Sequence, residues 1–465
     1  MPSPIPSPRH CACSDWRLSR RSLVRSGGSL VPVPVEALDG LAAFERDGGL
    51  SRRDFLANGV GLLALASSLG GTALEPRRAL TAAAAAHAAS PEAPVLVSLY
   101  LDGGNDGLNT LVPWTSPRYT ELRPRVGLAP QSLLPLADTA DFAWHPSLPG
   151  LAGLYGQGKV AVLPAVDFQN ADLSHFNSTE YWRKGIVGHV RDPTGWLGRC
   201  IDLTGSPDNP LQAISATWNL DPILLSARNP VATVYEPTEV SYWIEGVGNE
   251  EVPLALYRAL AGGVARYPAR AAAAKAYRDA ITVRQRLAPL QAAPPDAPPL
   301  AYPDAYLGRA LRSLARMLAA GFGTRVAAVA HDGGFDTHEQ QPEHHARILA
   351  ELDGALVAWQ ADLEARGLAD RVLTLVWSEF GRRPADNDSL GTDHGAGGLL
   401  LVVGNRANGG IVSEFPGLDV LDPLENLRVT TEFRTVYASL LEQWLAIDSE
   451  RVLGAVPARL QLVRG

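Results

Sequence analysis

Acidic and histidine side chains gather around short glycine-rich turns, and these residue types bind metal ions. One turn, GGFDTH, contains Asp336 and His338, and another, GTDHG, contains Asp393 and His394. Carboxylate oxygens and imidazole nitrogens suit Zn or Mn, which need several ligands converging from different parts of a chain. Any one of these acidic residues is as well explained as a turn or cap residue. The combination is what predicts a metal site.

Two further carboxylates follow apolar runs typical of buried strands. Residues 94–101, PVLVSLYL, lead into Asp102, and residues 372–377, VLTLVW, lead through a serine into Glu379. Open α/β sheets place ligand sites outside the carboxyl ends of their strands. We therefore expect both carboxylates to meet the residues that follow a third strand, at 324–330, and to hold one or two divalent metal ions, Zn or Mn.

The polar segment 172–182, DLSHFNSTEYW, contains hydroxyls and a histidine. Ser174 and the adjoining His175 are the first catalytic candidates, with Ser178 and Thr179 as the alternative hydroxyls; that one of these hydroxyls is a nucleophile is what the resemblance given below implies. A hydroxyl needs a metal ion or a base to activate it. Ser174 is equally well placed to cap a helix that begins at His175.

The patterns of strands and helices alternate, which predicts an α/β fold with a largely parallel central sheet and helices on both faces. The expected domain spans 89–465. Within it, residues from about 190 to 320 differ: they include an alanine- and arginine-rich helical stretch at 252–287 and a proline-rich connector at 290–303. We interpret this region as an inserted cap.

The N-terminal residues have a different character. Residues 1–50 are rich in Pro, Arg and Ser, which indicates a disordered leader or a mis-assigned start. Residues 51–88 contain Arg52 and Arg53, a short apolar run and a small-residue zone, a pattern typical of a twin-arginine export signal; the alternative is a surface helix with a chance arginine pair. We expect recognition by the twin-arginine translocation machinery, a periplasmic or extracellular location, and no stable membrane span after processing.

Composition narrows the function further. The formal net charge is −8 and the body of the chain has no basic stripe, which argues against a nucleic-acid partner. Only three cysteines are present, too few for a disulfide framework or a cysteine-based zinc site.

Four motifs together resemble the exported bacterial family catalogued as domain of unknown function 1501, over residues from about 95 to 450. The motifs are LDGGNDG at 101–107, GFDTH at 334–338, SEFGR at 378–382 and GTDHG at 391–395. That family is similar to a branch of the alkaline phosphatase and sulfatase superfamily. The resemblance implies an alkaline-phosphatase-like fold and a metal site.

Residue by residue, the resemblance makes Asp102 the first metal ligand and Asp336 with His338 an Asp–His pair of tighter spacing than usual. Glu379 takes the strand-end carboxylate position, and His394, beside Asp393, is the late histidine. Phe380 stands where a His or Asn normally ligates, which removes one ligand from a second metal ion.

The implied function is an exported metal-dependent hydrolase of phosphate or sulfate esters, acting on a small-molecule or glycan ester. Arg382 is the candidate for binding a charged ester oxygen, with a solvated loop face as the alternative. The alternative function is a non-catalytic exported binding protein on the same fold with an eroded metal site.

Overall fold

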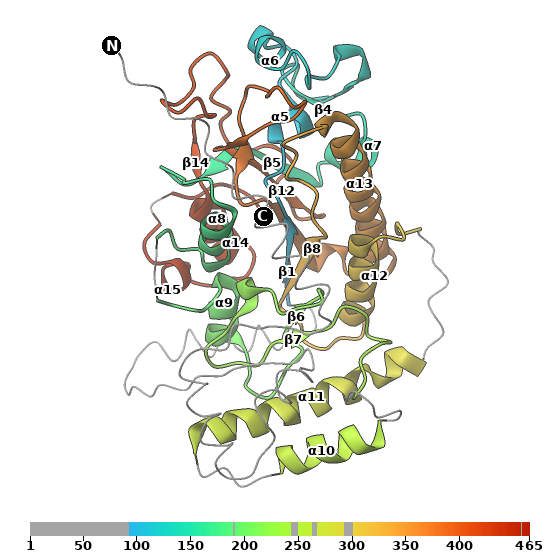
Figure 1. The fold of residues 1–465 in the computed structure, drawn as a ribbon. Coiled ribbons are helices and arrows are strands. Elements are labelled where there is room, and N and C mark those ends of the chain that lie inside the picture. The colour runs from blue at the N-terminus through green and yellow to red at the C-terminus, as the bar shows by residue number, and fades with distance from the viewer. Residues whose placement is uncertain (1–92, 189–190, 243–249, 263–266, 293–300, 457) are drawn as a thin grey trace.

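A computed structural model describes residues 93–188, 191–242, 250–262, 267–292, 301–456 and 458–465 (Figure 1). The expected leader and export signal lie outside these described residues. None of the helices in the described part of the chain has the length and apolar character that a bilayer crossing requires.

A mixed, mostly parallel sheet forms the centre of the molecule, with the strand order β13-β5-β12-β9-β1-β8-β6-β7 and β14 paired to β5. The strands are β1 (Val95–Leu101), β5 (Val160–Asp167), β6 (Ala213–Ser215), β7 (Ala232–Thr233), β8 (Val326–His331), β9 (Val372–Trp377), β12 (Gly398–Val403), β13 (Gly410–Ile411) and β14 (Thr431–Glu432). Strand β1 is parallel to both β8 and β9, whereas β12 is antiparallel to β9 and β5. The predicted α/β class is confirmed.

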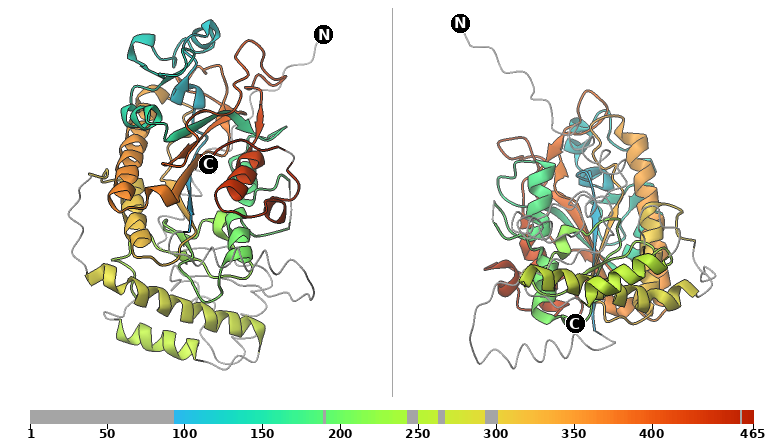
Figure 2. Two further views of the ribbon diagram at one scale, coloured as in Figure 1. Left: turned by 180° about the vertical axis from the view of Figure 1, so that it is seen from behind. Right: turned by 60° about the horizontal axis from the view of Figure 1, so that its bottom comes forward.

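Helices cover both faces of this sheet (Figures 1 and 2). On one side lie α7 (Pro149–Gly156), α12 (Tyr306–Ala319) and α13 (Gln341–Ala365), and on the other α8 (His175–Lys184), α9 (Trp196–Thr204), α14 (Phe433–Gln443) and α15 (Glu450–Leu453). Because successive side chains of a strand point to opposite faces, β1 contributes to two cores. Val95, Val97 and Leu99 pack in one hydrophobic cluster, and Leu96 and Tyr100 in the other.

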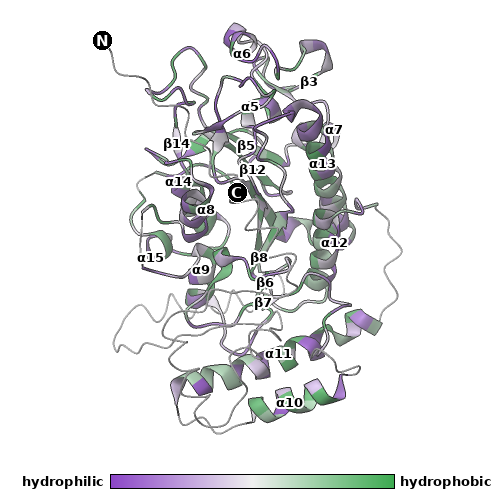
Figure 3. Ribbon diagram, viewed as in Figure 1, coloured by the Kyte–Doolittle hydropathy of each residue, from purple (hydrophilic) through white to green (hydrophobic). Residues whose placement is uncertain are grey.

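Burial on both faces explains why the central strands are continuous apolar runs. Every residue of β1, β5 and β9 is buried, and Figure 3 shows apolar residues concentrated in these inner strands while the outer helices mix both kinds.

Smaller elements surround this core. They are α5 (Gly107–Thr110), β2 (Leu111–Val112), α6 (Pro117–Leu122), β3 (Leu134–Pro135), β4 (Ala143–Trp144), β10 (Gly381–Arg382) and β11 (His394–Gly395). Figure 1 shows α5, α6 and β4 at one end of the molecule. At the opposite end lie α10 (Glu251–Ala261) and α11 (Pro268–Ala292), which pack on each other. The region expected to be an inserted cap thus holds α10 and α11, but it also supplies β6, β7 and α9 to the central layers.

Strand register brings the expected site residues to one edge. Leu101 of β1 pairs with His331 of β8, and Tyr100 pairs with Trp377 of β9. All three strands run in the same direction, so the residues that follow them, including Asp102 and Glu379, leave the sheet side by side.

Candidate metal centre

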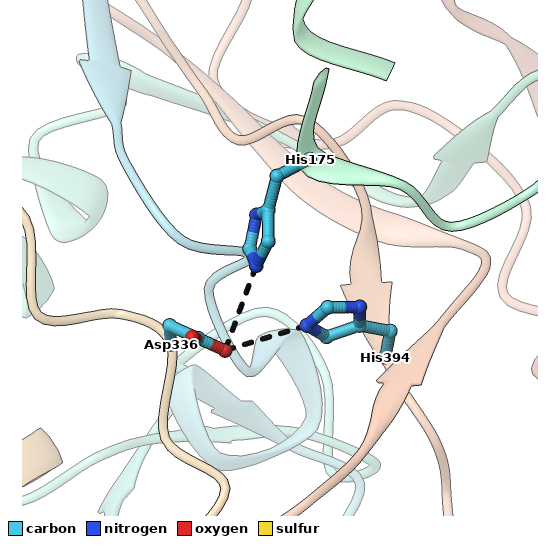
Figure 4. Close-up of side chains that lie close together, drawn as sticks. All are labelled: His175, Asp336 and His394. Atoms are coloured by element: carbon cyan, nitrogen blue, oxygen red, sulfur yellow. Dashed lines mark hydrogen bonds and ion pairs between the residues drawn. The ribbon is translucent and has the colours of Figure 1, made fainter. Parts of the chain in front are cut away.

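Three imidazoles converge on one carboxylate oxygen, Oδ1 of Asp336. The Nε2 atom of His338 lies 3.1 Å from this oxygen, that of His394 3.3 Å and that of His175 3.7 Å. Figure 4 shows His175 and His394 approaching Asp336 from two different segments. Helix α8 supplies His175 and strand β11 supplies His394. The loop after β8 supplies Asp336 and His338.

The opposite nitrogen of each ring is held by an oxygen. The Nδ1 contacts are 2.6 Å from His175 to Oε1 of Glu379, 2.9 Å from His394 to the carbonyl of Leu173, and 3.1 Å from His338 to Oδ1 of Asp393. Carbonyl and carboxylate oxygens accept hydrogen bonds, so each Nδ1 is the donor. In the neutral ring Nε2 then keeps its lone pair, and in the protonated ring Nε2 donates to Oδ1 of Asp336. Histidines that ligate metals are held in this way by a carboxylate or a carbonyl.

The spacing of the inner atoms suits a bound cation. The Nε2 atoms of His338 and His394 face each other at 3.0 Å, an arrangement that leaves two lone pairs opposed unless a proton or a metal ion lies between them. Tetrahedral zinc ligands at the usual bond lengths are about 3.3 Å apart. Donor atoms of His175, Asp336 and His394 all lie within 4.8 Å of one another, and His338 adds a fourth donor beside two of them.

Glu379 fixes the orientation of His175 in this centre. It is fully buried, and its carboxylate accepts hydrogen bonds from the backbone N–H groups of Gly103 and Gly104 as well as from His175. Both glycines have positive φ, 121° and 75°, and an added Cβ would collide with the backbone N of Asp336 or with the ring of Phe380. The glycines of the first motif therefore exist to place two N–H groups on Glu379, which in turn fixes the ring of His175.

Arg382 ties the loops of the site together. Its guanidinium is 0% exposed and donates to Oδ1 of Asp336 at 2.9 Å and to the carbonyls of Gly104, Thr392 and Phe335 at 2.7, 2.9 and 3.1 Å. It also donates to the carbonyl of Gly103. The sequence suggested that Arg382 binds a charged ester oxygen. Because its guanidinium is buried in this structure, an ester oxygen cannot reach it. Its neighbour Arg383 has a side chain 38% exposed.

The candidate hydroxyls lie on and before helix α8. Ser174 occupies the N-cap position, but its side chain makes no cap hydrogen bond. Ser178 is buried, and its hydroxyl has no hydrogen-bond partner among the described residues. Thr179 lies 3.1 Å from the hydroxyl of Tyr100, which donates to Oδ1 of Asp102 at 3.1 Å. The carboxylate of Asp102 thus accepts a hydrogen bond from the tyrosine, and its backbone carbonyl accepts one from the N–H of Phe335.

The imidazoles of the site differ in pKa because their surroundings differ in charge and burial. Burial opposes ionisation of Asp336, but hydrogen bonds from the three imidazoles and the charge of Arg382 hold its pKa well below its usual range. Burial lowers the pKa of His175, yet its bonds to Asp336 and Glu379 outweigh burial and raise the pKa to about 9. Burial lowers the pKa of His394 to about 4 despite its bond to Asp336. The low pKa of Asp336 and the raised pKa of His175 favour positive charge beside this carboxylate, whereas the lowered pKa of His394 favours a neutral ring, the form that ligates metal ions.

Three features of the site were not predicted. His175 faces Asp336 with its Nε2 instead of simply adjoining Ser174, the carbonyl of Leu173 holds His394, and the ring of Phe380 packs against two imidazoles at centroid distances of 4.9 and 4.4 Å. The available signal was the histidine itself, because imidazole is the commonest metal ligand among side chains.

Comparison with known proteins finds one family match, over part of the chain. Residues 266–460 match the family model described as "Protein of unknown function (DUF1501)", and three of the four motifs lie within this range. Over these residues the chain matches the model of the family that the motifs resemble. No curated protein matches the chain.

Two solved structures are similar at low identity. The phosphonate monoester hydrolase of Agrobacterium radiobacter is 12% identical, with 78% of each chain covered and a TM-score of 0.34. The phosphonate monoester hydrolase SpPMH from Silicibacter pomeroyi is 14% identical, with 78% of this chain and 77% of that chain covered and a TM-score of 0.23. Scores this low carry no argument about activity, and the α/β class rests on the strand order of this chain.

Proposed function

We propose that this chain is a divalent-metal-dependent hydrolase of phosphate or sulfate esters, with the metal ion held by His175, Asp336, His338 and His394. The observation that carries the proposal is the shared orientation of the three imidazoles. Each has its Nδ1 tied to an oxygen and its Nε2 directed at Oδ1 of Asp336. We infer that a largely buried cluster with that geometry binds a cation.

A divalent cation in this position would supply a Lewis acid for an ester oxygen and lower the pKa of a water molecule. The protein's part is to fix the ligands: Glu379 holds His175, and Arg382 holds the loop of Asp336.

The solvent-exposed side of the metal centre is suited to an anionic substrate. The side chains of His338 and Asp393 are 24% and 56% exposed, so a ligand approaches from there. The charge of Arg383 acts on Asp393 and contributes to lowering its pKa, after the larger effect of the hydrogen bond from His338. A partly exposed guanidinium at this mouth suits a charged ester oxygen. Ser174, half-buried next to His175, is the hydroxyl we assign as nucleophile.

One observation favours a second function, a non-catalytic binding protein. Arg382 donates to the same Oδ1 of Asp336 that the imidazoles face, so a cation already compensates that oxygen. A centre stabilised in this way can persist as a charge network without a metal ion.

Metal analysis and turnover together separate the two functions. Protein purified without chelator is analysed for Zn and Mn, and aryl phosphates and aryl sulfates are assayed. The hydrolase proposal predicts bound metal and turnover of one ester class. Protein that turns over neither ester class, with or without bound metal, supports the binding protein instead.

We also propose that residues 51–88 export the folded protein through the twin-arginine pathway to the periplasm or beyond. The support is the Arg52–Arg53 pair before a short apolar run.

A further inference from the structure

A second group of ligand-type residues lies where strand β8 ends. His331 is the last residue of β8, Asp332 follows it, and Glu351 lies on helix α13. One donor atom from each of the three lies within 4.8 Å of the others. None of the three belongs to the centre around Asp336.

The hydrogen bonding of His331 fixes which nitrogen is available. Its Nδ1 lies 3.0 Å from the carbonyl of Gly333, and a carbonyl can only accept, so Nδ1 carries the proton. In the neutral ring the lone pair of Nε2 then faces Oε1 of Glu351, at 3.5 Å. This is the arrangement found behind metal-ligating histidines, in which the other ring N–H is donated to a carbonyl.

The carboxylate of Glu351 would be stabilised by a cation in this contact. Its Oε1 is buried and accepts no hydrogen bond within the described part of the chain. A buried carboxylate oxygen opposite a nitrogen lone pair is costly unless positive charge lies between them.

The distance favours a metal ion over a shared proton. Hydrogen bonds between a nitrogen and an oxygen have lengths of about 2.7–3.2 Å, shorter than the 3.5 Å observed between His331 and Glu351. Nitrogen and oxygen ligands of one tetrahedral zinc ion lie about 3.4 Å apart. Asp332 has a side chain 60% exposed, with Oδ1 3.4 Å from Nδ1 of His331; turned toward Nε2, it would add a third oxygen-bearing ligand on the solvent side.

We propose that His331, Asp332 and Glu351 form a second, independent site for a divalent cation of the zinc or manganese class. One imidazole and two carboxylates are ligands that such ions accept. The loop that carries Asp336 and His338 leaves β8 at His331 and returns in α13, so an ion bridging His331 to Glu351 clamps the base of that loop. Its role is to brace the loop, independently of any reaction at the first centre.

The test is zinc binding by the full chain and by Glu351→Gln. The glutamine keeps the size of the side chain, and its amide N–H can donate to Nε2 of His331, so the variant is expected to fold. Glu343→Gln, at an exposed position of the same helix, is the matched control. Zinc is measured by plasma mass spectrometry after dialysis against micromolar Zn²⁺, and melting temperature is measured with and without zinc.

We expect Glu351→Gln to bind one zinc ion fewer per chain than the wild type and to lose part of the zinc-dependent rise in melting temperature, while Glu343→Gln matches the wild type. A His338→Ala variant should keep the ion that Glu351 binds, which separates this inference from the proposed function. Equal zinc content in Glu351→Gln and the wild type overturns the second site, whatever the first centre binds.

Discussion

Replacing Glu379 by Gln should weaken metal binding without displacing any ligand. Glu379 is buried, and although burial opposes its ionisation, the hydrogen bond with His175 lowers its pKa, so it is charged at neutral pH. It holds Nδ1 of His175 at 2.6 Å. The amide has the same shape but lacks the charge that makes the imidazole a stronger ligand.

The size of the effect follows from two contributions. Losing a carboxylate behind a ligating histidine reduces metal affinity by about 10–100-fold, which corresponds to roughly 1.4–2.7 kcal/mol. The new amide must also face the N–H groups of Gly103 and Gly104, both donors to the carboxylate. A buried donor left without an acceptor costs about 1–3 kcal/mol of stability.

The assay is a zinc competition titration against a chromophoric chelator, together with urea unfolding of the metal-free protein. Asp202→Asn is the control: its carboxylate accepts backbone N–H groups from Ala227, Arg228 and Asn229, away from the centre. The control should lose stability but keep zinc affinity. Zinc affinity of Glu379→Gln within twofold of the wild type would refute the role we assign to Glu379.

Three other predictions address catalysis, pH and export. His338→Ala should lose metal and activity together, whereas Ser174→Ala should lose activity but keep its metal; a cap role instead predicts a loss of only about 1 kcal/mol of stability. Burial raises the pKa of Asp167 from 3.8 to about 7, so the folded chain keeps a proton there that the unfolded chain releases. Stability should therefore fall as pH rises from about 4 to about 7, and Asp167→Asn should flatten that slope in urea midpoints; an unchanged slope would count against it. Changing Arg52 and Arg53 to Lys should leave the precursor in the cytoplasm, and unchanged export in a fractionation experiment would contradict the signal.

Much of the sheet could be predicted because strands buried on both faces are continuous apolar runs. Strands β1, β9 and β12 are such runs; β1 and β9 end close to a polar motif, and β12 begins just after one. Direction could not be predicted: β12 is antiparallel to its neighbours, and an apolar run has the same pattern read either way.

The ligand types of the site could be predicted, but the part each residue plays could not. Asp336, His338 and His394 do converge, as acidic and histidine residues beside strand ends suggest. Glu379 holds His175 in place, and the backbone N–H groups of Gly103 and Gly104 in turn hold the carboxylate of Glu379. These glycines lie more than two hundred residues earlier in the chain. Such tertiary contacts leave no local signal.

The central claim is that the three imidazoles and Asp336 hold a metal ion, and direct metal analysis tests it. Wild-type protein, His338→Ala and Ser174→Ala are purified without chelator, dialysed against micromolar Zn²⁺ and analysed by plasma mass spectrometry. We expect the wild type and Ser174→Ala to carry an ion that His338→Ala lacks. Equal zinc content in folded wild type and folded His338→Ala would contradict the claim.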